Sequence, residues 1–191
     1  SLFIIIFTLF LISFLDTLIV VGIFFPASFF VMSAGFFVTG IPKIILYFII
    51  IVVGGLLGDL ISFYLGKKGI DWVNKRKLLS KFLYIEKGKA FFEKHGNKGI
   101  LFGRFLGVIK SIIPFVAGFL GMNLKKFIVL NIFANIIWTT INFGIGLILG
   151  KIFNTFYVPK SIEFVVVFLP FILFFGWFFI QYTPKIIRFL K

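Results

Sequence analysis

The chain has 191 residues, a length typical of one domain; 61% of them are apolar and 21% aromatic, with 32 phenylalanines. A water-soluble domain of this size cannot bury so much apolar surface, so the composition indicates an integral membrane protein. Cysteine is absent and there is one histidine. This excludes disulfides, thiolate catalysis and metal centres rich in cysteine or histidine, and we expect neither a metal nor a cofactor.

The formal net charge of +14 has a local origin. Ten of the 20 lysines and arginines lie in residues 67–98, together with three acidic residues. Basic segments beside transmembrane helices usually stay in the cytoplasm and contact anionic lipid. We therefore expect no nucleic-acid partner, and we predict that residues 67–98 form a cytoplasmic amphipathic segment, with His95 in solvent.

The N-terminal apolar block is too long for one membrane crossing. Pro26 divides it into a predicted transmembrane helix over residues 1–25 and a shorter piece over 26–38. Residues 1–25 have neither a basic beginning nor a clear cleavage site, so we do not expect a signal peptide. A transmembrane helix is then predicted over residues 43–66.

A second interrupted block follows the basic segment. Residues 99–123 are apolar but contain Pro114 and five glycines, and transmembrane helices are predicted over 127–150 and 162–182. Because a crossing needs about 20 helical residues, we predict that 26–38 and 99–123 are re-entrant hairpins. Ordinary helices kinked at proline explain the pattern equally well.

The distribution of charge favours the hairpins. If residues 99–123 enter and leave on one side, then the segment 67–98, the basic C-terminal tail and the N-terminus all lie in the cytoplasm. A hairpin followed by a helix then occurs twice, in opposite orientations, between N- and C-terminal transmembrane helices. The prediction is one all-α integral membrane domain over residues 1–191, located in the cell membrane. Inverted repeats with interrupted segments are typical of secondary transporters.

Few ionisable residues lie within the apolar segments, where a charge is costly and marks a candidate for function. Asp59 lies on a helix face of small side chains, which predicts that it points into the helix bundle. Pairing with a basic residue of the cytoplasmic segment is the alternative. The small side chains of that face are Gly55, Gly58, Ser62 and Gly66.

Arg104 and Lys110 lie on the second interrupted segment, just before Ser111 and Pro114. Two cations beside a broken backbone can bind a phosphate or another anion. Arg104 is close enough to the cytoplasmic end to reach lipid headgroups instead, whereas Lys110 lies deeper. Asp16 is expected either to meet these cations, as counter-ion or proton carrier, or to reach a headgroup.

Three asparagines share one face of the predicted helix 127–150. In a membrane helix such side chains usually form interhelical hydrogen bonds, and we expect that role rather than ligand binding. They are Asn131, Asn135 and Asn142.

Taken together, these motifs resemble the DedA family, also called the VTT or SNARE-associated Golgi protein family. The strongest stretch covers residues 92–118, where F-E-K-H-G precedes R-F and then K-S-I-I-P-F-V-A-G. Residues 54–69 (G-G-L-L-G-D-L-I-S-F-Y-L-G-K-K-G) are similar to the family's G-D segment, and Asp16 with residues 26–35 is similar to its acidic residue and first hairpin. The resemblance covers roughly residues 14–151, and the order of several motifs makes it specific.

The resemblance implies inner-membrane proteins with two opposed re-entrant hairpins that move lipids across bilayers. Bacterial members are linked to recycling of undecaprenyl phosphate and to phospholipid translocation, coupled to protons or the membrane potential, and eukaryotic relatives are scramblases. Asp16 takes the family's acidic position, and Arg104 and Lys110 take its two basic positions. The structural residues of the hairpins are Pro26, Gly35, Pro114 and Gly118.

The chain departs from the family pattern at three places. Lys110 replaces a usual arginine, which keeps the charge but loses the two-pronged fork that suits phosphate. Gly107 stands where proline is frequent. Ser28 occupies the position of a second hairpin carboxylate, so proton coupling would depend on Asp16, with Asp59 as the other candidate.

The expected function is transport of a phospholipid or polyprenyl phosphate in the manner of a flippase or scramblase, with Arg104 and Lys110 holding the phosphate. The alternatives are a transporter of a small anion or ion-coupled solute with the same architecture, and a membrane scaffold without transport. No nucleophile–base pair is recognisable, so we do not expect an enzyme. Whether the chain forms a homo-oligomer stays open.

Overall fold

The computed structural model of this chain describes residues 2–19, 21–22, 27–76, 90, 92, 94–105 and 110–155, without the side chains of 70–76 and 97. All regular elements in these ranges are helices. The described part therefore confirms the predicted all-helical fold. The predicted helix 162–182 and residues 77–89, 91 and 93 of the basic segment lie outside it.

The first three helices are α1 (Leu2–Thr17), α2 (Ala27–Phe37) and α3 (Ile41–Arg76). α1 ends at Thr17, so the prediction of a helix as far as residue 25 was wrong. The apolar sequence continues past Thr17, but the backbone leaves the helix in a turn closed by a 2.8 Å hydrogen bond from the Gly22 N–H to the Leu18 carbonyl. α3 is confirmed over residues 43–66 and continues into the basic stretch.

The second interrupted block contains two short helices, α5 (Gly99–Gly103) after a 3₁₀ turn η2 (Gly96–Lys98), and α6 (Ile113–Phe119). Pro114 lies in the first turn of α6, where its missing N–H has no helical partner to lose. α6 ends at Phe119, and Gly121, two residues later, has a φ of 72° in the left-handed region that glycine tolerates. The last helix, α7 (Leu124–Thr155), includes the predicted span 127–150.

The two long helices run antiparallel. The ring of Phe63 in α3 stacks on Phe127 in α7 at 4.4 Å between ring centres, and Phe48 meets Phe143 edge-on at 6.4 Å. α3 over Ile41–Gly69 and α7 are long and apolar enough to cross a bilayer. All contacts described here belong to one compact unit, Ser1–Leu147, and a second unit begins at Ile148.

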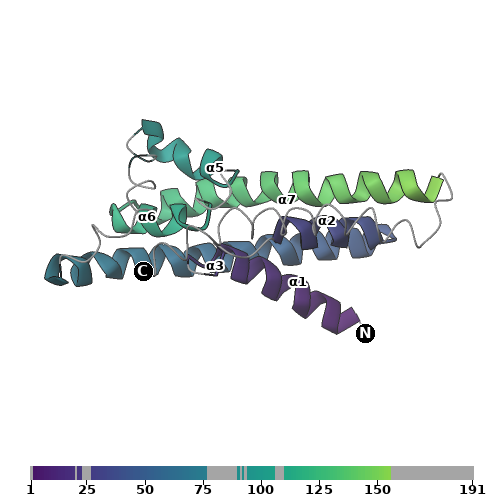
Figure 1. Cartoon of the computed structure of the whole chain (residues 1–191), viewed down its shortest axis with the longest axis horizontal. Coiled ribbons are helices and arrows are strands. Elements are labelled where there is room, and N and C mark those ends of the chain that lie inside the picture. The colour runs from purple at the N-terminus through teal and green to yellow at the C-terminus, as the bar shows by residue number, and fades with distance from the viewer. Residues whose placement is uncertain are drawn as a thin grey trace, which may run out of the picture. The chain divides into compact units, whose positions relative to one another are not determined.

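Each of two short helices packs on a long helix through a reciprocal pair of glycines, α6 on α3 and α2 on α7 (Figure 1). A side chain added at any of these glycines would overlap the backbone of the partner helix. The helices therefore approach as closely as their backbones allow. The contacts are Gly118 against Phe63, Gly66 against Phe115, Gly35 against Phe143 and Gly146 against Met32.

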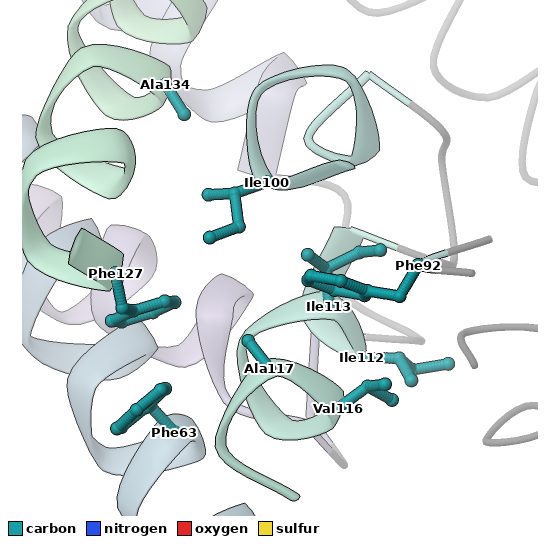
Figure 2. Close-up of a cluster of buried hydrophobic side chains, with 9 residues drawn as sticks. All are labelled: Phe63, Phe92, Ile100, Ile112, Ile113, Val116, Ala117, Phe127 and Ala134. Carbon is teal, nitrogen blue, oxygen red and sulfur yellow. The ribbon is translucent and has the colours of Figure 1, made fainter. Parts of the chain in front are cut away.

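The buried apolar side chains form two clusters. Figure 2 shows the first, in which Phe63 and Phe127 face each other beside side chains of α5 and α6, and Phe92, Ile112 and Ala134 complete the group. The second cluster joins α1, α2, α3 and α7 and includes Tyr47, Ile51 and Trp138. On α3 and α7, Asp59 and Asn135 lie between the positions that belong to the two clusters.

Candidate binding site

The end of α1 is set by Ser62 of α3. The Ser62 hydroxyl donates a 3.0 Å hydrogen bond to the Thr17 carbonyl and accepts one of 3.2 Å from the Ile19 N–H. Both backbone groups lie where the helix stops, so a side chain 43 or more residues away satisfies them. Asp16 is thereby held at the last turn of α1, where its side chain is buried.

Asp16 pairs with Lys110. The Lys110 ammonium lies 2.7 Å from one carboxylate oxygen of Asp16 and 2.8 Å from the other. Gly22 makes this approach possible, because a side chain there would overlap the Asp16 carbonyl and come within 2.8 Å of the Ser111 Cβ. The expectation that Asp16 meets a cation of the second interrupted block is confirmed.

Asp59 pairs with Arg104. The Arg104 Nη1 lies 2.5 Å from the Asp59 Oδ2, and both side chains are buried. Of the two placements open for Asp59, the structure has the one inside the helix bundle. The Arg104 side chain is likewise directed into the bundle, with 9% of it exposed. Gly55 leaves room for the guanidinium, because a Cβ there would lie 3.0 Å from the Arg104 Nη2.

Asn135 and Asn131 of α7 complete the surroundings of Arg104. Its Nη2 donates to the Asn135 side-chain oxygen and its Nη1 to that of Asn131, at 3.4 Å. The Asn135 amide nitrogen in turn donates to the Asp59 carboxylate at 3.0 Å. The expected interhelical hydrogen bonds are therefore present, but they join the charged site itself. Asn142 bonds instead to the Trp138 carbonyl of its own helix.

Trp138 lies beside both cations. The Lys110 nitrogen is 5.2 Å from the centre of its ring and the Arg104 guanidinium carbon is 5.9 Å away. These distances are in the range where a cation is attracted to the electron-rich face of an indole. The ring is almost fully buried, and it forms an apolar surface beside both ion pairs.

The site is formally neutral, with two carboxylates and two cations brought together from α1, α3 and the segments around α5 and α6. A buried charge without a partner costs several kcal/mol or more, and within each pair the carboxylate and the cation offset this cost for one another. Exposure is small throughout. The exposed fractions of the side chains are 1% for Asp59, 9% for Arg104, 4% for Asp16 and 13% for Lys110.

The remaining predicted residues lie at other places. Ser28 is the second residue of α2 and half-buried, and within the described ranges no hydrogen bond joins it to the four charges. Gly35 and Gly118 make the helix contacts given above, and Pro114 begins α6. Pro26 lies outside the described residues.

Sequence reasoning missed Trp138, Gly22 and the site role of Asn135. A tryptophan in an apolar helix gives no signal of its own, since it fits a buried core equally well. The asparagine face of α7 was the available signal for Asn135. In the described ranges no group of three or more histidine, cysteine or acidic residues is arranged to hold a metal ion.

Comparison with known proteins agrees with the motifs. The model of the VTT domain matches residues 25–148. An uncharacterized membrane protein of Buchnera aphidicola subsp. Schizaphis graminum is 36% identical over 154 residues, which is 79% of this chain and 61% of that protein. The inner membrane protein YabI of Escherichia coli is 32% identical over 148 residues, which is 73% of this chain and 56% of YabI.

More distant relatives point the same way. Protein DedA of E. coli is 27% identical over 149 residues, which is 75% of this chain and 68% of DedA. The chain spans about three fifths of the length of the first curated relatives it matches. No solved structure matches. The matched domain covers well over half of the chain, and the chain therefore belongs to the VTT-domain, or DedA, family of inner membrane proteins.

Proposed function

We propose that this protein transports a lipid with a phosphate headgroup, a phospholipid or a polyprenyl phosphate, across the membrane. One observation carries the proposal: Arg104, which is buried, and Lys110, which is partly buried, lie beside the same Trp138 ring within the apolar length of the bundle. Asp59, the partner of Arg104, lies eight residues from Lys67 and sixteen from Lys43, or about 12 Å and 24 Å along α3. Cations at such depth are costly and mark a pathway for an anion.

The architecture proposed for this activity is an inverted repeat. The helix α2 with its preceding turn, and α5 with α6, would be re-entrant hairpins entering from opposite sides, with both termini and the basic segment 67–98 in the cytoplasm. Two features support this. The tripeptide Ala-Gly-Phe occurs in both hairpin helices, at 34–36 and 117–119. Its glycine packs in each case on the long helix of the other repeat.

In this proposal Arg104 and Lys110 attract the headgroup phosphate and Asp16 acts as counter-ion or proton carrier. Because Ser28 cannot carry a proton near neutral pH, coupling to protons or to the membrane potential would depend on Asp16, with Asp59 as the other acidic group. No enzymatic step is included.

Proteoliposomes provide the test. We expect labelled phospholipid or polyprenyl phosphate to cross the bilayer with the parent protein, with and without a pH gradient, and this movement to be lost with Arg104→Ala and Lys110→Ala. Lys43→Ala is the matched control, because Lys43 is exposed at the start of α3. Normal translocation by both site variants, in vesicles shown to contain folded protein, would exclude the proposal. Uptake of a soluble anion without lipid movement would favour the small-anion transporter.

The complete pairing of the buried charges favours a second candidate, a membrane scaffold without transport. Both cations already have carboxylate partners, so they can serve packing alone. In a scaffold, neutral substitutions at Asp16 and Arg104 would reduce folding or do nothing. A loss of lipid movement in a variant that still folds separates the transporter from the scaffold.

A further inference from the structure

The two cations of the site are held in different ways. Arg104 contacts side chains from two helices, Asp59 of α3 and both Asn131 and Asn135 of α7. Lys110 has one ion-pair partner in the described structure, Asp16, and its side chain is the most exposed of the four charged groups. Arg104 is therefore fixed by several bonds at once, whereas Lys110 depends on a single pair.

The chemistry of the side chains matches this difference. A guanidinium is a rigid planar fork, and two of its nitrogens are already directed at fixed partners. An ammonium is a point charge on a flexible stem that can turn its donors from one anion to another. Trp138 lies 5.2 Å from the Lys110 nitrogen, so an ammonium that leaves Asp16 keeps an attractive surface beside it.

Charge balance decides how an anion can enter. The site holds two positive and two negative groups, so a further anion added to it would be a buried charge without a partner. The arriving anion must therefore take the place of a carboxylate, and the released carboxylate must take up a proton so that the site does not keep an unpaired negative charge. Replacing Asp59 at Arg104 would break its bonds to both Arg104 and Asn135, whereas replacing Asp16 at Lys110 breaks one pair.

We propose that the ligand's phosphate exchanges with the Asp16 carboxylate at Lys110, while Arg104 remains held by Asp59 and Asn135. Asp16 is then a competitor of the ligand, and the Asp59–Asn135 group is a positioning element that does not release its cation. This inference rests on the proposed function for the source of the phosphate. A lipid headgroup and free phosphate share the chemistry that the site recognises.

Binding can be measured through Trp138 in the full chain. We would replace the other two tryptophans, Trp72→Phe and Trp177→Phe, purify the protein in maltoside micelles, and titrate its fluorescence. The probes are dioctanoyl phosphatidic acid, inorganic phosphate, and dioctanoylglycerol as the lipid without phosphate. Asp16→Asn and Asp59→Asn form a matched pair, because each removes one carboxylate of the same site by the same chemical change.

The proposal predicts an asymmetry between these two variants. Asp16→Asn should lower the Kd for the phosphate-bearing lipid at least about tenfold, because the competing anion is gone. Asp59→Asn should not lower it. Exchange at Lys110 is overturned if phosphatidic acid binds but its Kd is unchanged by Asp16→Asn, or is changed equally by both variants. Either result leaves the lipid proposal standing.

The other outcomes are also decisive. If no phosphate-bearing probe binds the parent or Asp16→Asn, the proposed function fails and the exchange fails with it. Binding of inorganic phosphate as tight as that of phosphatidic acid, with the same asymmetry, supports the exchange and overturns the lipid as its source. If Asp16→Asn does not fold, the neutral double variant Asp16→Asn/Lys110→Gln replaces it. That variant must lose binding, and retained binding would contradict the exchange.

Discussion

Asn135 of α7 donates a 3.0 Å hydrogen bond to the Asp59 carboxylate of α3. The same amide accepts a bond from Arg104 through its oxygen. One side chain thus contacts the acid and the base of a buried ion pair, using an opposite end of its amide for each. This is possible because the antiparallel long helices bring positions 59 and 135 to the same level, between the two apolar clusters.

Asn135→Leu is expected to destabilise the protein, because it leaves Arg104 and Asp59 each short of a partner. The cost of buried polar groups without partners is about 1–3 kcal/mol, more where they are charged. Asn142→Leu is the control on the same helix, since Asn142 bonds only to a carbonyl of its own helix in the described structure. Thermal unfolding in detergent should show a clear loss for Asn135→Leu and a small change for Asn142→Leu. Equal changes would mean that Asn135 does not support the pair.

A second prediction concerns the reciprocal glycine contacts between the short and the long helices. Gly146→Ala should destabilise the contact of α2 with α7, because the added methyl group meets the Met32 backbone. Overpacking of this kind costs about 1–3 kcal/mol. Gly144→Ala lies two residues away, with no described atom within 4 Å of the new methyl group, and alanine favours helix. The melting temperature should fall for the first variant and hold or rise for the second. A similar fall for both would show that the close contact of Gly146 with α2 does not decide the effect.

The four charged residues could be predicted from the sequence, because ionisable side chains in apolar segments are rare enough to notice. Their pairing could not. Asp16 and Lys110 are 94 residues apart, and nothing in the local sequence says which acid meets which base. The small-residue face of α3 did predict that Asp59 lies in the bundle, since Gly55 leaves the space that Arg104 occupies.

The end of α1 shows why local sequence was insufficient. Residues 18–25 are apolar and contain no strong helix breaker except glycine. The predicted helix therefore extended to residue 25. The helix stops because Ser62, far away in the chain, takes over the Thr17 carbonyl and the Ile19 N–H. A tertiary contact of this kind overrides the local preference and cannot be seen in a window of neighbouring residues.

Ser62→Ala should therefore lower the free energy of unfolding by more than the loss of one hydrogen bond would. Two backbone groups lose their partner at once, and about 1–3 kcal/mol is expected for such groups when buried. Ser33→Ala is the matched control, because the Ser33 hydroxyl is buried without a hydrogen-bond partner among the described residues. Chemical or thermal unfolding of the two variants should differ, with Ser33→Ala neutral or more stable. If Ser62→Ala proves as stable as Ser33→Ala, Ser62 does not hold the end of α1.

Trp138 offers the most direct test of how the ring serves the cations. Trp138→Phe keeps an aromatic face in the apolar cluster, whereas Trp138→Leu keeps only apolar volume. If the ring attracts the Lys110 ammonium, lipid translocation should fall more with leucine than with phenylalanine. The difference corresponds to a cation–ring attraction of about 1–2 kcal/mol in a dry site.

Packing alone would also penalise the smaller side chain, so the comparison is repeated with Lys110→Met. Two residues in contact give a non-additive double-variant cycle, and the free energy of unfolding can be measured even where transport is lost. We expect the effect of Trp138→Leu on unfolding to shrink by about 1 kcal/mol when Lys110 is already neutral. If the effects of the two substitutions on unfolding simply add, Trp138 contributes only apolar packing. Trp138→Phe should then support translocation no better than Trp138→Leu.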